Sequence, residues 1–392
     1  MARSRSPTDM VAMLAADGAA ARRTTRPGSV PPPAAPAYVD ALVREVQARP
    51  DADDARLVLA DALLAHGDPR GELIALQLAA AAPAATPAAL ATTPAATPAA
   101  TPAATDERRL ERIDQLLREH ARSWLGPLRE VTYRARFERG FVARLELNGR
   151  WTATEPDWAR HALDPTLATV EDLIPGRSVG PVYTRFLTSP AMTALRRIEV
   201  FDKPTLEGLR ATAANLVHVS CPRWKVGKYV RELADHVLPA CERFAALSSF
   251  AVHIDGAASV MASSLWPRLT ALTVAGGLAA GLALWPRLPR TMSLTVARSA
   301  LLENCVTTRA AWAGALHVWR DGDHAVARGS GGWLVGELVE HFAALPGELR
   351  RLEIEGAAGH AEALTAAARR RGIELVLLPL PRRAGYVAGL DR

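Results

Sequence analysis

Six side chains with the chemistry of a recognition surface stand beside apolar residues in the second half of this chain. They are three histidines, a tryptophan and an arginine–glutamate pair: His218, His253, His317, Trp319, Arg351 and Glu353. Neighbouring side chains of a strand point to opposite faces, so these six should share the face that the apolar residues leave free. Tryptophan and arginine carry much of the binding energy at protein interfaces. The pattern predicts a partner-binding face; an ordinary solvated strand face is the alternative.

Two turn-like stretches offer weaker candidates for chemistry. Residues 321–324 (Asp-Gly-Asp-His) gather two carboxylates and an imidazole, but Asp-Gly is itself typical of a tight hairpin turn. Residues 328–332 (Arg-Gly-Ser-Gly-Gly) could cradle a phosphate before a helix. They lack the Lys-Ser/Thr pair of a phosphate-binding loop. We therefore interpret the first stretch as a hairpin turn and the second as a loop.

Acidic residues between positions 51 and 72 could be read as metal ligands. They are Asp51, Asp53, Asp54, Asp61, Asp68 and Glu72. A calcium loop needs oxygen ligands at alternate positions, a glycine turn and a closing glutamate, and this spacing does not provide them. Capping of helix N-termini and favourable helix-dipole contacts account for the acids. The sequence also has no HExxH or GxSxG motif. We expect no catalytic residue, no metal site and no cofactor.

The elements that would position the recognition face repeat along the chain. Four apolar–x–apolar segments begin at Phe250, Leu272, Leu294 and Leu316, each 22 residues after the one before. A period of about 20–29 residues is typical of stacked strand–helix units such as leucine-rich repeats. Less regular units lie near positions 173, 198, 217, 352 and 375, with helices predicted over 226–244, 332–344 and 360–371. No unit has the asparagine that leucine-rich repeats place after the strand, so we predict an irregular leucine-rich-repeat-like α/β solenoid.

A small helical module precedes these repeats. Helices are predicted from about 38 to 49, after Asp53 and after Asp68-Pro69, where aspartate and proline are typical of a helix start. The second helix should bury Leu57, Ala60 and Leu64, which lie on one helical face.

The module resembles the bacterial repeat-companion domain, which precedes leucine-rich-repeat-like repeats in families of uncharacterised proteins. Six residues carry the resemblance: Asp61, Gly67, Asp68, Arg70, Gly71 and Glu72. Residues 120–128 and 139–142 resemble its usual continuation. Aromatic residues often flank the second-helix aspartate in that family, but Leu59 and Ala62 stand there in this chain. The resemblance implies an architecture and no known activity.

The predicted organisation has four parts. Residues 1–36 form a disordered arm and residues 37–123 the helical module, into which a Pro/Ala/Thr linker is inserted at 82–105. Residues 124–380 form the solenoid, capped at its N-terminal end by a β-hairpin that turns at Gly140, and residues 381–392 form a tail.

Composition narrows the class of protein. The net charge is +6, of which the arm carries +3, and such an arm is usually solvated. The three cysteines (Cys221, Cys241 and Cys305) form no CxxC pair, which favours buried thiols in a reducing compartment. Residues 269–286 hold no charge, but they fit the 22-residue register as a strand and a helix rather than a membrane span.

We therefore expect a cytoplasmic, non-catalytic protein that binds a protein partner on its strand face. Two alternatives stay open. The first is a nucleic-acid-associated regulator that uses the Arg-rich arm, although charge alone gives little reason to expect nucleic acid. The second is an enzyme whose site has no recognisable motif. We expect no membrane contact, and the sequence does not indicate the oligomeric state.

Overall fold

The computed structural model describes residues 37–81, 102–148, 160–175, 180–200, 203–221, 228–297, 315–330, 332–378 and 386–388. The backbone divides into a short unit, Met1–Asp40, and a large unit, Ala41–Arg392. Of the short unit, only the first turn of helix α2 (Ala37–Ala48) is described. The Arg-rich arm predicted for residues 1–36 lies outside the described residues, and everything below concerns the large unit.

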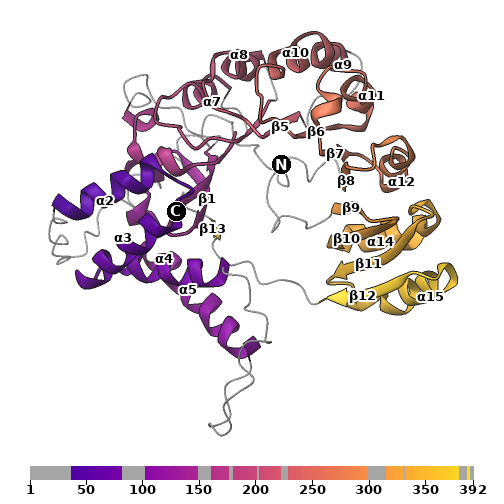
Figure 1. The fold of residues 1–392 in the computed structure, drawn as a ribbon, viewed down its shortest axis with the longest axis horizontal. Helices are drawn as coiled ribbons and strands as arrows, with labels where there is room; N and C mark the ends of the chain where they lie inside the picture. The colour runs from indigo at the N-terminus through magenta and orange to yellow at the C-terminus, as the bar shows by residue number, and fades with distance from the viewer. Residues whose placement is uncertain are drawn as a thin grey trace, which may run out of the picture. The chain divides into compact units, whose positions relative to one another are not determined.

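The described residues of the large unit build a mixed α/β structure on one thirteen-stranded sheet (Figure 1). Its order is β12-β11-β10-β9-β8-β7-β6-β5-β4-β3-β2-β1-β13. Pairing is parallel from β2 to β8 and from β10 to β12, and antiparallel elsewhere. The strands are β1 (Thr132–Glu138), β2 (Phe141–Leu147), β3 (Asp172–Ile174), β4 (Arg197–Glu199), β5 (His218–Cys221), β6 (Ser249–His253), β7 (Ala271–Ala275), β8 (Ser293–Ala297), β9 (Ala315–Asp321), β10 (His324–Ser330), β11 (Leu349–Glu355), β12 (Glu374–Leu378) and β13 (Tyr386–Ala388).

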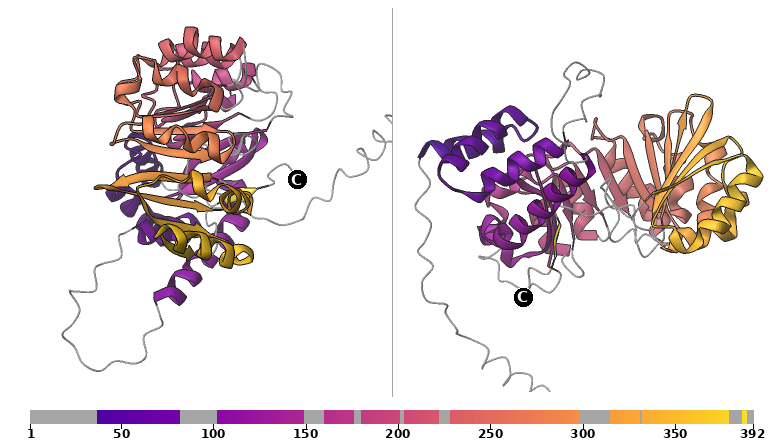
Figure 2. Two further views of the ribbon diagram at one scale, coloured as in Figure 1. Left: turned by 90° about the vertical axis from the view of Figure 1, so that its right-hand side faces the viewer. Right: turned by 90° about the horizontal axis from the view of Figure 1, so that it is seen from below.

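Short helices follow the strands and cover one face of the sheet (Figures 1 and 2). They are α7 (Gly180–Leu187), α8 (Lys203–Ala211), α9 (Lys228–Glu232), α10 (Leu238–Cys241), α11 (Ala257–Met261), α12 (Leu278–Leu282), α14 (Gly332–His341) and α15 (Ala361–Arg371). The uncharged stretch 269–286 contributes β7 and α12, as its repeat register predicts. Within the described residues, no helix is both long and apolar enough to cross a membrane.

The inward apolar residues of the parallel strands stand in register across the sheet. Leu173, Ile198, Val219, Phe250, Leu272 and Leu294 stand side by side across six parallel strands, and each is fully buried or nearly so. The intervals between β4, β5 and β6 are irregular in sequence, yet the inward residues remain aligned. The connections between the strands differ in length, because surface connections can change while the inward residues stay packed in the core.

The fourth regular segment departs from the predicted repeat. Leu294 pairs with Val318 and Val296 with Leu316, so β9 runs antiparallel to β8. A hairpin with Gly322 at a φ of 61° then leads into β10, which restores the parallel direction. The spacing of 22 residues therefore sets the inward phase of β9 but not its direction. The predicted turn at residues 321–324 is confirmed.

Strand β10 replaces the loop expected at residues 328–332. Residues 328–330 pair with β11 instead of forming a phosphate-binding turn. The inward residues of β10 are small (Ala325, Ala327 and Gly329), so the strand lacks the large apolar residues that mark the other units. A side chain at Gly329 would lie 2.2 Å from Leu334 of α14. The close approach of that helix explains why the strand carries no bulky inward residue there.

Three arginines link a unit to the unit before it through backbone carbonyl groups. Arg243 donates hydrogen bonds to the carbonyls of Arg210 and Thr212 in the preceding unit. Arg268 donates in the same way to Glu242 and Phe244. Arg371 does so from α15 to the carbonyl oxygens of Phe342 (2.8 Å) and Leu345 (3.1 Å). These guanidinium groups satisfy carbonyls at the ends of helices and turns.

The helical module consists of α2, α3 (Asp53–Ala65), α4 (Pro69–Ala81) and α5 (Pro102–Trp124). Helix α5 begins within the predicted linker, at Pro102; residues 82–101 lie outside the described residues. The backbone N–H of Arg70 donates to Asp68 Oδ1, which confirms the predicted helix start. The predicted inner face of α3 is wrong in part. Ala60 is buried, but Leu57 and Leu64 are about half exposed, and Arg56, Leu59 and Leu63 are buried instead.

Arg70 and Gln77 of α4 dock this module onto the β1–β2 hairpin. The Arg70 guanidinium lies 4.2 Å from the centre of the Phe141 ring and donates to the carbonyl of Gly140 (3.0 Å). Gln77 of α4 holds both sides of the turn, accepting from Gly140 N–H at 2.7 Å and donating to the carbonyl of Phe137 at 2.9 Å. Gly71 lets α4 approach α3, since a side chain there would lie 2.6 Å from the carbonyl oxygen of Ala60.

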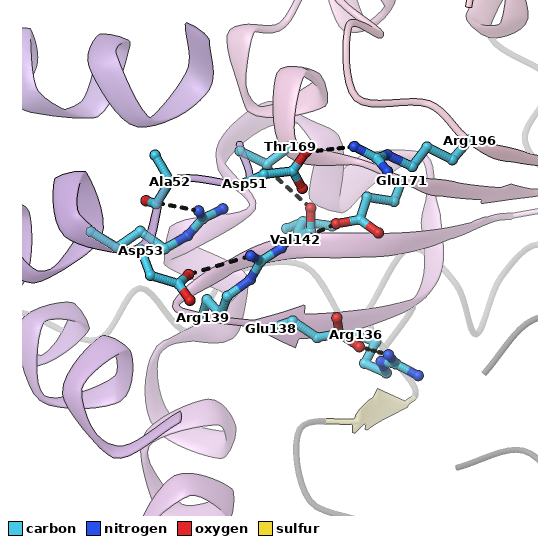
Figure 3. A network of polar contacts seen from close by, with 11 residues as sticks. Asp51, Ala52, Asp53, Arg136, Glu138, Arg139, Val142, Thr169, Glu171 and Arg196 are labelled. Carbon is cyan, nitrogen blue, oxygen red and sulfur yellow. Dashed lines mark hydrogen bonds and ion pairs between the residues drawn. The ribbon is translucent and has the colours of Figure 1, made fainter. Parts of the chain in front are cut away.

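A polar network continues this junction toward β3 and β4 (Figure 3). Arg139, at a positive φ of 50° in the hairpin turn, forms ion pairs with Asp53 (3.3 Å) and Glu171 (3.2 Å). Asp51 pairs with Arg196 at 2.5 Å. The hairpin turn is therefore held from both sides by charges of the module and of the first repeat units.

The C-terminal strand corrects the predicted tail. Residues 386–388 form β13 and pair antiparallel with β1, at the opposite end of the sheet from β12. Seven residues, 379–385, connect the two strands and lie outside the described residues. The predicted tail therefore contributes an edge strand next to the N-terminal hairpin.

Candidate interaction surface

The six predicted recognition residues share one face of the sheet but not one site. They belong to β5 (His218), β6 (His253), β9 (His317 and Trp319) and β11 (Arg351 and Glu353). Neighbouring strands are about 4.8 Å apart, so β6 and β9, with β7 and β8 between them, are about 14 Å apart. The residues therefore form three groups along the sheet: one on β4–β6, one on β8–β9 and one on β10–β12.

In the β4–β6 group, His218 is buried rather than solvated. His218 is 7% exposed, its Nδ1 lies 2.8 Å from Ser249 Oγ, and it is paired in register with Arg197. Burial, helped by the charge of Arg197, lowers the pKa of His218 to about 3. Ser220, two residues further along the strand, is fully buried. Neither Nε2 of His218 nor Oγ of Ser220 has a hydrogen-bond partner in the described part of the chain.

A serine next to a histidine is also the start of a nucleophilic site, but this pair is poorly suited to that work. A general base is most effective when its pKa is near the working pH. With a pKa of about 3, His218 is too weak a base to take the proton of Ser249. We therefore interpret the pair as a structural hydrogen bond within the sheet.

The depressed pKa of His218 predicts an acid-sensitive fold. Because the unfolded chain takes up the proton at a pKa of about 6.5 and the folded chain at about 3, stability is complete above pH 6.5 and falls as the pH is lowered. The expected slope is about 1.4 kcal/mol per pH unit between these two values. Between pH 7 and pH 5, we expect the wild type to lose about 2 kcal/mol more than the His218→Gln variant. Urea unfolding at both pH values measures the difference; parallel losses would contradict the burial of a neutral imidazole.

His253 is engaged in a local turn. Its Nδ1 lies 3.0 Å from Asp255 Oδ2. The same nitrogen accepts a hydrogen bond from the backbone N–H of Asp255 at the start of a 3₁₀ turn. This imidazole therefore caps a turn, and its position gives no separate reason to expect a ligand.

The β8–β9 group joins an aromatic stack to a row of hydroxyl groups. The rings of His317 and Trp319 stack with their centres 5.1 Å apart and their planes 30° apart. Nδ1 of His317 lies 3.0 Å from Thr295 Oγ1 on β8. Leu316 and Val318 are fully buried, which confirms the predicted phase, and Trp319 is partly exposed on the other face. Burial lowers the pKa of His317 to about 4, so the imidazole is neutral at pH 7.

The β10–β12 group is an ion-pair network, and it includes a residue that the sequence did not indicate. In the β9–β10 hairpin His324 pairs with Asp321, and the same antiparallel register, continued along the strands, sets Arg328 opposite His317. Arg328 is paired with Glu353 of β11. Arg328 binds Glu355 at 2.6 Å, and Arg351 binds Glu353 at 2.9 Å. Arg328 was missed because its segment was interpreted as a loop. Its position on β10, paired with Glu353 and Glu355 of β11, is visible only once β10 is known.

Four of the six acidic residues considered as metal ligands have other roles. Asp51, Asp53 and Glu72 form ion pairs with arginines, and Asp68 caps helix α4. The described residues contain no group of three or more His, Cys, Asp or Glu side chains arranged to hold a metal ion. Cys221 and Cys241 are buried and outside any disulfide, and burial raises the pKa of both thiols, so neither is a ready nucleophile. Cys305 lies outside the described residues.

Comparison with known proteins gives no relative for this chain. No protein-family model matches it, and neither does any curated protein or solved structure.

Proposed function

We propose that the chain is a non-catalytic interaction protein that binds a partner protein on its strand face, with the His317–Trp319 stack at the centre. In this proposal the repeat units form an irregular leucine-rich-repeat-like solenoid, capped at its N-terminal end by the β-hairpin, and the helical module that precedes it is a repeat-companion domain. The buried, unpaired thiols are consistent with work in the reducing cytoplasm.

The aromatic stack is the observation that carries the proposal. Trp319 is partly exposed, and its ring is fixed by a neutral histidine that is itself held by Thr295. A fixed ring loses little conformational freedom on binding, which is one reason why tryptophan dominates interface energetics. Ser293 and Thr295 on β8 supply hydroxyl groups on one side, and Arg328 supplies a guanidinium group on the other. This mixture of aromatic, hydroxyl and charged groups suits a protein surface.

The Trp319→Ala variant should weaken partner binding by at least about 1–2 kcal/mol without unfolding the protein. The partner would be captured from native lysate, purified and titrated against both proteins, with circular dichroism as the folding control. Thr273→Ala is the matched control, since it changes the same face two strands away and should bind like the wild type. If a folded Trp319→Ala protein binds with unchanged affinity, this face is not the site.

A further inference from the structure

Helix α3 turns an apolar stripe toward solvent. Leu57, Val58 and Leu64 are 52%, 56% and 47% exposed, although the same helix buries Leu59 and Leu63 completely or nearly so. Residues at positions i, i+4 and i+7 of a helix share a face, so Leu57, Asp61 and Leu64 form one line, with Val58 beside it. Large apolar residues gathered on one exposed helix face are typical of interaction sites.

The same face is acidic. Asp54 and Asp61 are exposed, and neither forms an ion pair among the described residues. The basic residues that could balance them point elsewhere: Arg56, the only basic residue of α3, is 2% exposed, and Arg70 lies against the Phe141 ring. The junction with the hairpin therefore draws positive charge inward and leaves an outward face of leucine, valine and aspartate.

We propose that this face of α3 is a second docking site, which binds a basic amphipathic helix of a partner protein. Charge complementarity selects the partner, because a segment with lysines or arginines beside its apolar stripe would pair with Asp54 and Asp61 while covering the leucines. From Asp54 to Leu64 the helix rises about 15 Å, enough for about three turns of a partner helix. The site lies on the module and does not depend on the strand face.

The test uses the full chain and a synthetic probe. The probe is a fluorescein-labelled Leu/Lys peptide of about 18 residues, with its leucines on one helical stripe. Fluorescence anisotropy would measure its affinity for the wild type, for the Leu57→Ser/Leu64→Ser variant and for the Asp54→Asn/Asp61→Asn variant. Leu163→Ser is the matched control, since Leu163 is a 61% exposed leucine outside the module. A peptide of the same composition in scrambled order controls for the apolar stripe. A Leu/Glu peptide controls for the positive charge.

We expect each double variant to bind the probe at least tenfold more weakly than the wild type, and Leu163→Ser to bind it equally well. The scrambled and acidic peptides should also bind at least tenfold more weakly. Val58→Ser serves as a second variant if circular dichroism shows that a double variant is unfolded. No binding to the wild type, or equal binding of the scrambled peptide, would overturn the proposal. So would self-association of the wild type that Leu57→Ser/Leu64→Ser abolishes, because a second copy would then occupy the face.

Discussion

Replacing Leu294 with alanine is expected to lower the free energy of unfolding by about 2–5 kcal/mol, and Leu272→Ala by a similar amount. Both side chains are fully buried, and they stand next to each other on β7 and β8 in the line of inward residues. Removing either leaves a cavity between a strand and the helices that cover it, where neighbouring units on both sides limit collapse.

Thr273→Ala is the matched control for these two variants. Thr273 lies on β7 next to Leu272 but points to the opposite, partly exposed face. The Thr273→Ala substitution should lower the free energy of unfolding by less than about 1 kcal/mol, as most substitutions away from the core do. Urea unfolding of the three variants measures the difference. Equal costs for Leu272→Ala and Thr273→Ala would show that the period of 22 residues is assigned in the wrong phase.

The inward phase of the strands could be predicted because it depends on local alternation. Leu316 and Val318 point inward and Trp319 outward, as their order in the sequence predicts. Strand direction could not be predicted in the same way. An antiparallel β9 buries the same two residues as a parallel one, so the apolar pattern is identical in both cases.

The sequence did not predict strand β10, the inner face of α3 or the grouping of the six site residues. In each case the structure depends on a neighbouring element of the fold. Small inward residues conceal β10 because α14 approaches too closely for larger ones. In α3 the apolar residues allow two inner faces, and the hairpin selects the one that contains Arg56, whose guanidinium lies 5.6 Å from the centre of the Phe141 ring. The site groups show the same limit: the sequence places six residues on one face, but only the sheet order shows that they divide into three groups.

Five arginines of the described residues make contacts that join different parts of the chain. Arg243, Arg268 and Arg371 donate to carbonyl groups of the preceding unit, and Arg139 and Arg196 pair with acids of the module. Charge alone gives little reason to expect nucleic acid as a partner. These five guanidinium groups link neighbouring parts of the sheet and the module, so they do not by themselves indicate a nucleic-acid partner.

Gly140→Ala is expected to loosen the docking of the module and to lower the free energy of unfolding by about 2–5 kcal/mol. Two causes add. Gly140 has a φ of 79°, where an alanine costs about 1–2 kcal/mol, and its added Cβ would lie 2.1 Å from Cγ1 of Ile74 in α4. Ile74 is fully buried and cannot move aside freely, so overpacking adds about 1–3 kcal/mol.

Gly322→Ala separates the two causes. Gly322 has a φ of 61° in the β9–β10 turn, but an added Cβ there would meet no atom within 4 Å. It should therefore cost only the backbone term, about 1–2 kcal/mol. In an Ile74→Ala background, Gly140→Ala should also cost about 1–2 kcal/mol, because the clash is gone. Urea unfolding of the wild type, Gly140→Ala, Ile74→Ala and the double variant measures these costs. If Gly140→Ala costs the same with and without the Ile74 side chain, the hairpin turn does not pack against Ile74, and the other contacts of the module, such as that of Arg70 with Phe141, hold it to the hairpin.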